Sequence, residues 1–590
     1  MKKVLSYLNE ILTLLGEERR KLPALVVLFL FASLFDLVGL GLIAPSISFV
    51  LNPSKVDSIF YDQIINLFEV KPNWEYLILI LGLGLVLVFL FKAIGNLWIQ
   101  YRIISFSKSQ QIRLQTYLMN SYQNMPYQVY LNRNSSEFVH SIQHLVINYC
   151  TVVQILLKCF SDLLIAFMII LVLAWQSVLI LTLLIGLMTG LIVLYDRFFQ
   201  KTLHEYGKRN IVANHQIVQS LNEGIHGLKE IRILGKKSFF FNKLMDGSKQ
   251  TTYYMLRQNM LNLVPGYLME FILVAFVVLV LSFGVFLDAN LNDIIPTMGV
   301  FGIAALRLKP TATNLASGLI KVRFFRDTIR RLTEDIKSVK SMESRKIITL
   351  NNKKQIIPFQ KLILNQVSFA YNGTSQLALK NISLQIKEGE TIGIIGTSGS
   401  GKTTLVDVLL GLMEPQSGSI ILNGKPLLKN LAEWHSHVSY LPQQVFLIDN
   451  SLRCNVALGE TESAIEESRL QEALRQARLS ELVKQLHQGV NTILGERGVR
   501  LSGGQRQRVA LARAFYHGRS VLVMDEATSA LDNETEKEIV NEIQRLKGHK
   551  TMIVIAHRLT TVQHCDRIYR LEKGQIVEEG TPEQVINIAN

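Results

Sequence analysis

A glycine-rich loop in the second half of the chain has the residue types and spacing that bind the phosphates of a nucleotide. It reads Gly396-Thr397-Ser398-Gly399-Ser400-Gly401-Lys402-Thr403 and fits the pattern G-x-x-x-x-G-K-[ST]. Its glycines let backbone N–H groups approach phosphate oxygens, and a helix opening at Lys402-Thr403-Thr404 adds a favourable field for anions. We expect ATP here, with Lys402 on the β and γ phosphates and the Thr403 hydroxyl on Mg²⁺.

Two adjacent acids follow an apolar run further along, in Ser520-Val-Leu-Val-Met-Asp525-Glu526. The run suits a buried strand. We interpret Asp525 as a Mg²⁺ ligand and Glu526 as the base that polarises the attacking water. Paired acids could instead cap the next helix. The phosphate loop upstream favours the catalytic interpretation.

The run Leu501-Ser502-Gly503-Gly504-Gln505 lies between these two motifs. Its small residues predict a helix N-terminus with free N–H groups, which is a second anion site. In this order the three motifs resemble the ATP-binding cassette (ABC) transporter family, and the resemblance covers nearly the whole chain. It implies that this signature closes over ATP held by another cassette. Because the chain has one cassette, we expect a homodimer in which both sites hydrolyse ATP.

The resemblance also implies roles for residues outside these motifs. Tyr371 resembles the aromatic residue that stacks on adenine, Gln443 the residue that senses Mg²⁺ and the membrane domain, and His557 the switch that contacts the γ phosphate. Ser529–Asp532 and Gly495–Gly498 resemble the family's communication loops. The predicted catalytic residues are Glu526, His557 and Gln443; the metal ligands are Thr403, Gln443 and Asp525; and the nucleotide contacts are Tyr371, Gly396, Thr397, Ser398, Gly399, Ser400, Gly401, Lys402, Thr403, Thr404, Ser502, Gly503, Gly504 and Gln505.

The elements that must position these residues fall in two unlike halves of the 590-residue chain. Long apolar runs fill residues 1–320, whereas residues 340–590 have the composition of a soluble domain. We predict an α-helical transmembrane domain of the exporter type (1–332), a linker (333–359) and an α/β P-loop ATPase domain (360–590). The net charge of +15 fits basic cytoplasmic loops better than a nucleic-acid partner, because no aromatic-basic platform accompanies it.

Six apolar runs are long enough to cross a bilayer. They are Pro23–Ile43, Tyr76–Ile99, Ile155–Trp175, Val178–Phe198, Leu263–Leu287 and Ile294–Ser317. Basic residues concentrate in the links after the second and fourth runs, which places those links and both termini in the cytoplasm. We therefore expect a multi-pass protein of the bacterial inner (cytoplasmic) membrane.

The two basic links are too long for structureless loops, so the helices are expected to continue into the cytoplasm and turn back. The turns are predicted near Met125–Phe138 and Glu223–Phe241. The second resembles the segment that couples ABC exporters to their ATPase domains, although an ordinary amphipathic surface helix is the alternative. An external segment, Asp57–Val70, has an apolar stripe that fits a short helix on the outer membrane surface or against the spans.

Three basic residues at membrane depth are candidates for contact with cargo: Lys92, Arg307 and Lys309. At helical rise, Arg307 lies roughly 20 Å and Lys92 roughly 24 Å from the outer side, which is the cytoplasmic third of the bilayer. They could snorkel to inner headgroups or line a basic vestibule for an anionic headgroup. Arg307 and Lys309 are two residues apart, so at most one is expected to point straight into a cavity.

Short motifs in the spans bear on the cargo. Gly39–Pro45 and Ala305–Pro310 look similar to segments of the bacterial lipid-linked oligosaccharide flippases, which implies a polyprenyl-pyrophosphate glycan moved from the inner to the outer leaflet. Alternative cargoes for an exporter are drugs, lipid A-like lipids or peptides. A nucleotide-gated channel or regulator is the alternative from another class, and the complete set of ATPase residues disfavours it.

Overall fold

The computed structural model describes residues 2–587 apart from 32, 35–73, 177, 287–290, 347–356, 375, 526–539, 543 and 557–561. Several predictions lie outside the described residues: the motif Gly39–Pro45, the external segment Asp57–Val70, Glu526, the loop Ser529–Asp532 and His557. The chain forms two compact units. One comprises Met1–Asn124 and Arg133–Ser341, and the other Met125–Asn132 and Met342–Asn590.

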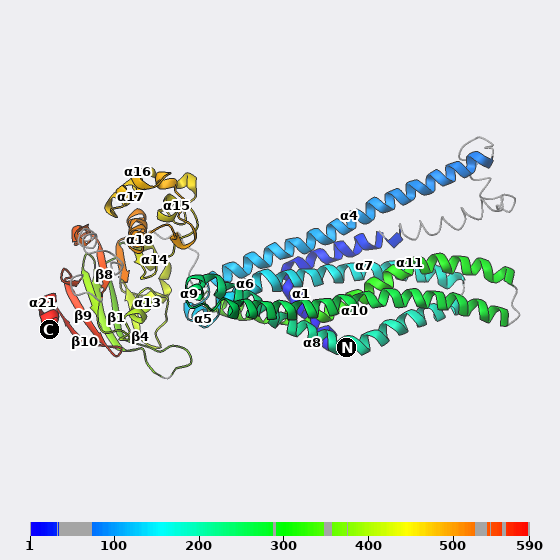
Figure 1. The fold of residues 1–590 in the computed structure, drawn as a ribbon, viewed down its shortest axis with the longest axis horizontal. Helices are drawn as coiled ribbons and strands as arrows, with labels where there is room; N and C mark the ends of the chain where they lie inside the picture. The colour runs from blue at the N-terminus through cyan, green and yellow to red at the C-terminus, as the bar shows by residue number, and fades with distance from the viewer. Residues whose placement is uncertain are drawn as a thin grey trace. The chain divides into compact units, whose positions relative to one another are not determined.

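The first unit is built from long helices, shown in Figure 1. Its elements are α1 (Lys2–Leu15), η1 (Gly16–Lys21), α4 (Trp74–Gln123), α6 (Ser135–His140), the π-helical turn η3 (Ser141–Leu145), α7 (Val146–Gln176), α8 (Val178–His226), α9 (Leu228–Ile233), α10 (Lys237–Phe286), α11 (Leu291–Phe324) and α12 (Arg326–Lys346). α12 continues the helical unit into the first part of the predicted linker. With 50 residues, α4 is roughly 75 Å long, more than twice the hydrocarbon layer.

Four described helices are long and apolar enough to cross a membrane: Gly82–Gln123, Ser135–Trp175, Val178–His226 and Lys237–Ser282. They contain most of the second to fifth predicted spans. The first predicted span, Pro23–Ile43, is only partly described, and the sixth, Ile294–Ser317, lies within α11. The link between the third and fourth predicted spans falls where the sequence predicts it, since α7 ends at Gln176 and α8 begins at Val178.

The long helices turn back at the predicted places. After α4 the chain forms α5 (Tyr127–Leu131), and after α8 it forms α9. Residues 125–132 group with the second unit, and Tyr127 packs against the apolar core of that unit. α9 leaves Ile233 (76% exposed) and Leu234 (69%) uncovered by the chain's own residues.

The second unit contains two sheets (Figure 1). The antiparallel sheet has the order β2-β1-β4-β5, with β1 (Lys361–Phe369), β2 (Leu379–Lys387), β4 (Ser417–Leu422) and β5 (Lys425–Pro426). The other has the order β10-β9-β3-β8-β7-β6, with β3 (Thr391–Ile395), β6 (Val438–Leu441), β7 (Val521–Asp525), β8 (Thr551–Ile555), β9 (Arg567–Glu572) and β10 (Gln575–Gly580). Its pairs are parallel except β9 with β10.

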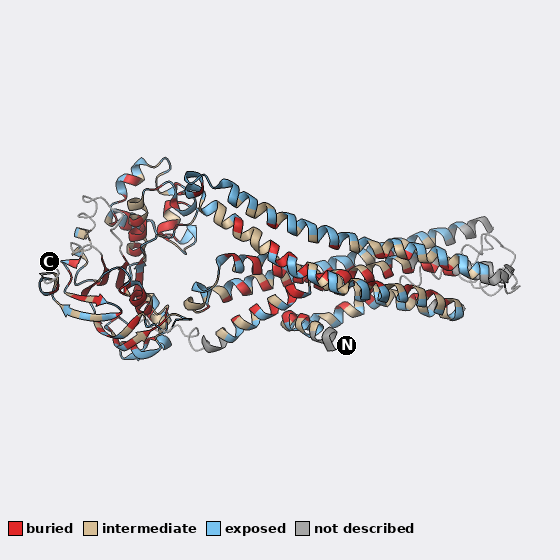
Figure 2. Cartoon of the chain, turned by 60° about the horizontal axis from the view of Figure 1, so that its bottom comes forward, coloured by how far each residue is buried: buried red, intermediate tan, exposed pale blue. Residues whose placement is uncertain are grey.

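Helices pack around these sheets and on one another. They are α13 (Lys402–Leu409), α14 (Leu431–His437), α15 (Leu452–Val456), α16 (Glu467–Gln476), α17 (Ser480–Gln485), α18 (Gly503–His517) and α21 (Pro582–Asn587). In α16 the buried residues are Leu470, Ala473 and Leu474, at helical spacing. Strands β3, β7 and β8 are buried at every position, as their unbroken apolar runs predict. Figure 2 shows buried residues concentrated in these strands and along the helix seams of the first unit.

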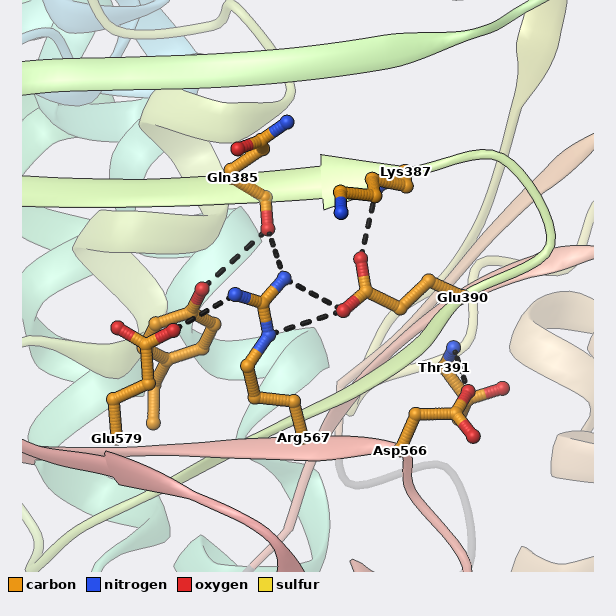
Figure 3. Close-up of polar contacts among 8 residues, drawn as sticks. Gln385, Lys387, Glu390, Thr391, Asp566, Arg567 and Glu579 are labelled. Carbon is orange, nitrogen blue, oxygen red and sulfur yellow. Dashed lines mark hydrogen bonds and ion pairs between the residues drawn. The ribbon is translucent and has the colours of Figure 1, made fainter.

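A polar cluster fixes the entry to β3 (Figure 3). Arg567 of β9 donates to Glu390 at 2.6 and 3.0 Å, to Glu579 at 2.7 Å and to the Gln385 carbonyl at 2.9 Å. Next to it, the Thr391 N–H donates to Asp566 at 2.8 Å. These bonds tie β2, β9 and β10 to the residues where β3 begins, so they fix the strand that carries the phosphate loop.

Candidate nucleotide-binding site

The parallel sheet brings the ends of three strands to one edge. Ile555 of β8 pairs with Ile394 of β3 on one side and with Asp525 of β7 on the other. The phosphate loop follows β3, and Asp525 is the last residue of β7. Since all three strands run the same way, the loop and the Asp525 carboxylate share the carboxyl edge, where open α/β sheets bind ligands. β8 also ends there, two residues before His557 in sequence.

The phosphate loop has a backbone that only glycine accommodates. Gly396 has φ 155°, and a Cβ atom on it would lie 2.2 Å from the Leu571 carbonyl oxygen. Gly401, with φ 105°, caps the N-terminus of α13 in the left-handed region. Lys402 is buried and curls over the loop, donating to the carbonyls of Gly396 at 2.8 Å and Thr397 at 3.0 Å. A tight backbone cradle with an inward-turned ammonium group fits a polyphosphate.

Tyr371 lies beside the helix that the phosphate loop opens. Its hydroxyl is 2.9 Å from the Thr404 hydroxyl. Thr404 is buried, whereas Thr403 is exposed. The structure therefore brings the predicted adenine-stacking residue and the predicted Mg²⁺-binding hydroxyl to the same end of α13.

The Asp525 carboxylate has two neighbours that the sequence argument missed. Tyr440 of β6 donates to it at 3.4 Å, and the half-buried Asp407 of α13 is near enough to feel its charge. Burial and the nearby Asp525 charge together raise the pKa of Asp407 to about 6. Asp525 ends β7 at the edge that also carries the phosphate loop and the Thr403 hydroxyl, and oxygen ligands of these two types fit Mg²⁺. Tyr440 was missed because Asp525 lies 85 residues further along the chain and only the pairing of β6 with β7 brings the two together.

Gln443 is exposed and lies two residues beyond the end of β6, the strand that neighbours β7. It therefore follows the strand next to the one that carries Asp525. Glu526 and His557 follow β7 and β8 in sequence and lie outside the described residues.

The signature opens a helix, as predicted. Ser502 caps α18: its side chain accepts from the Gln505 N–H at 3.2 Å, and the Gln505 side chain accepts from the Ser502 N–H at 2.8 Å. This reciprocal pair is a capping box. Gln505 thus has a structural role that the pattern S-x-x-Q could have predicted. Leu501 is buried in the apolar core around α18 and anchors the turn.

The basic residues predicted for cargo contact have different surroundings. Lys92 is only 6% exposed and lies next to a cavity between residues 24–31 and α4, with its ammonium group 5.2 Å from the Phe89 ring centroid. Lys309 of α11 forms an ion pair with Glu270 of α10 at 2.8 Å. The side chain of Arg307 is outside the described residues.

Both halves of the chain match known families. Residues 379–529 match the family described as ABC transporter, and residues 26–303 match the ABC transporter transmembrane region. A Saccharophagus degradans protein named ATP-dependent lipid A-core flippase is 30% identical over 473 residues, which cover 78% of this chain and 77% of that protein. This chain belongs to the ABC transporter family. The predicted ATP-binding cassette fused to a helical membrane domain is confirmed.

Two further similarities are more limited, the first in the share of the chain that is covered and the second in sequence identity. A Polaromonas protein, also named ATP-dependent lipid A-core flippase, is 47% identical over 221 residues, but only 37% of each chain is covered. The solved structure of a bacterial Atm1-family ABC exporter with ATP bound superimposes with a TM-score of 0.73 over 98% of this chain and 97% of that chain. At 18% identity, this likeness shows the exporter fold alone.

Proposed function

We propose that this ABC transporter couples ATP hydrolysis to the movement of a phosphate-bearing lipid of the lipid A-core type across the bacterial inner membrane. The single observation that carries the proposal is the Saccharophagus relative named a lipid A-core flippase, because the alignment covers 77% of that protein. At the carboxyl edge of the parallel sheet, the phosphate loop follows β3 and Asp525 ends β7, one on each side of β8, and this arrangement supports the ATPase half of the proposal.

The chain's residues divide the work at the ATP site. Lys402 and the loop amides hold the phosphates, while the ring of Tyr371 stacks on adenine. Thr403, Gln443 and Asp525 hold Mg²⁺, which neutralises phosphate charge when bound. Tyr440 orients Asp525. Glu526 polarises the attacking water, and His557 contacts the γ phosphate.

The functional unit we propose is a homodimer. The capping box of Ser502 and Gln505 leaves the Gly503 and Gly504 N–H groups at the start of α18 for an anion. We propose that they close over ATP bound to the second copy. The segments around α5 and α9 then carry this closure to the membrane helices.

For the cargo, the names of the reported relatives favour our alternative prediction, lipid A-like lipids, over lipid-linked oligosaccharide. Both lipids carry phosphate on an apolar anchor, so both fit a basic vestibule. Of the two span motifs similar to the oligosaccharide flippases, Gly39–Pro45 lies outside the described residues.

The test is transport in proteoliposomes containing the purified protein and either fluorescent lipid A-core or fluorescent lipid-linked oligosaccharide. We expect ATP-dependent movement of lipid A-core, lost in Glu526→Gln although that variant still binds ATP. Movement of the oligosaccharide lipid alone would replace the proposed cargo with our first prediction. If neither lipid moves and drugs stimulate the ATPase, the protein is a drug exporter.

A further inference from the structure

Helices α10 and α11 meet along an antiparallel seam whose contacts repeat every turn. The Ser317 hydroxyl donates to the Asn262 carbonyl at 3.2 Å. One turn on, a Cβ atom on Gly266 would lie 3.5 Å from the Thr313 methyl group. One turn further, the Lys309 ammonium group meets the Glu270 carboxylate at 2.8 Å. The ion pair is thus one of a regular series of contacts between α10 and α11.

The depth of this ion pair can be estimated from both sides of the bilayer. Glu270 is seven residues beyond Leu263, where the fifth predicted span begins on the cytoplasmic side, or roughly 10 Å at helical rise. Lys309 is fifteen residues beyond Ile294, or roughly 22 Å from the outer side of a layer about 30 Å thick. The two estimates agree within about 2 Å. The charges therefore lie inside the hydrocarbon layer, near its inner boundary.

The ion pair lies at the open edge of the seam. The residues preceding each partner, Met269 and Leu308, are buried in the apolar core of the first unit, at 0% and 5% exposure. The Glu270 side chain, by contrast, is 64% exposed and that of Lys309 33%. Charges at membrane depth are costly against lipid tails and normally face a water-filled cavity. The chain's own residues thus leave this edge uncovered, and in the proposed homodimer a charge at this depth is expected to face the transport cavity.

We propose that Glu270 is the resident counter-anion of Lys309, and that the phosphate group of the transported lipid takes its place on the ammonium group. An ammonium group has three donors, and the ion pair uses one of them. A phosphate offers more oxygens and more charge than a carboxylate, so it competes well for Lys309 in a hydrated cavity. This inference rests on the proposed function, since it names the headgroup chemistry that the transporter selects.

Competition has a measurable consequence. Glu270→Gln removes the competing charge and keeps the side-chain shape. We expect the lipid concentration that half-maximally stimulates the ATPase to fall about three- to tenfold, in the range of a partly exposed ion pair. Lys309→Gln should raise it, and the double variant should behave like Lys309→Gln. A neutral lipid should show no shift in any variant.

The experiment uses the full-length protein in nanodiscs, with lipid A-core and polyprenyl-pyrophosphate lipids in separate arms to distinguish the two sources of phosphate. Glu205→Gln is the matched control. It breaks an ion pair of equal length, 2.8 Å to Arg209, outside the predicted spans. An unchanged or raised half-maximal concentration in Glu270→Gln overturns the inference and leaves the ion pair with a structural role only.

Two safeguards keep the outcomes separate. If Glu270→Gln fails to fold, Glu270→Ala removes the same charge and should also lower the half-maximal concentration. An unchanged concentration in Glu270→Ala would overturn the inference. A wild-type protein that moves neither lipid refutes the proposed function, whereas a wild type that moves lipid beside an unshifted Glu270→Gln refutes only the role of Glu270.

Discussion

Replacing Tyr371 tests whether its ring holds the adenine of ATP. Base-on-aromatic stacking is worth about 1–3 kcal/mol by alanine substitution, which is about 5- to 150-fold in affinity. The ring is half-buried, and its hydroxyl bonds to Thr404 at 2.9 Å, so it is already oriented before ATP arrives. We therefore expect Tyr371→Ala to weaken ATP binding by a factor in the upper part of that range.

Two milder variants separate the ring from its hydroxyl. Tyr371→Phe keeps the stacking surface and loses one hydrogen bond, worth about 1 kcal/mol, so affinity should fall by no more than about fivefold. Thr404→Val removes the same bond together with the predicted contact of Thr404 with the nucleotide, so affinity should fall at least as far as in Tyr371→Phe. The assay is equilibrium binding of a fluorescent ATP analogue in the Glu526→Gln background, where turnover is blocked. Binding by Tyr371→Ala within twofold of its parent would refute the adenine assignment.

Two further predictions concern the ATPase domain. Arg567→Met should lower stability by about 2 kcal/mol, a fall of about 4–8 °C in Tm, because Glu390 and Glu579 lose their ion pair and the Gln385 carbonyl loses one of its two donors. Arg570→Met on the same strand should cost about half as much, and equal falls in thermal unfolding would contradict this. The raised pKa of Asp407, about 6 against 3.8, means that ionising it costs stability as the pH rises through that window. The test is thermal unfolding without magnesium or nucleotide. Asp407→Asn should be more stable than wild type by about 1 kcal/mol at pH 7.5, a value reduced to allow for solvent screening, and equally stable near pH 4. A stability difference that does not change with pH would contradict the prediction.

Much of the fold could be predicted from local patterns. Apolar runs of about twenty residues predicted the spans that α4, α7, α8 and α10 contain, because a bilayer imposes a length on every helix that crosses it. Long basic links predicted that these helices extend beyond the membrane, and they turn at α5 and α9 as expected. The order of strands in the sheet could not be predicted this way, since β3 pairs with β8 although the two strands lie more than a hundred positions apart in sequence.

The candidate site divides along the same line. The phosphate loop, Asp525 and the signature were found because glycine, lysine and acid spacing along the chain is itself the chemical requirement. Tyr440, Asp407 and Glu270 were not assigned to any site, because each acts on a partner that only folding brings near. Lys309 was found as an isolated charge, but its carboxylate partner lies on another helix.

The sequence by itself determined the type of energy source, the family and the number of cassettes per chain, because those depend on short motifs and their order. Only the tertiary structure decided which strand ends share the carboxyl edge, that Tyr440 donates to Asp525, and that Lys309 already has an anion beside it. The physical reason is range. A motif states which groups are available within a few residues, whereas hydrogen bonds and ion pairs between distant segments depend on the register in which helices and strands pack.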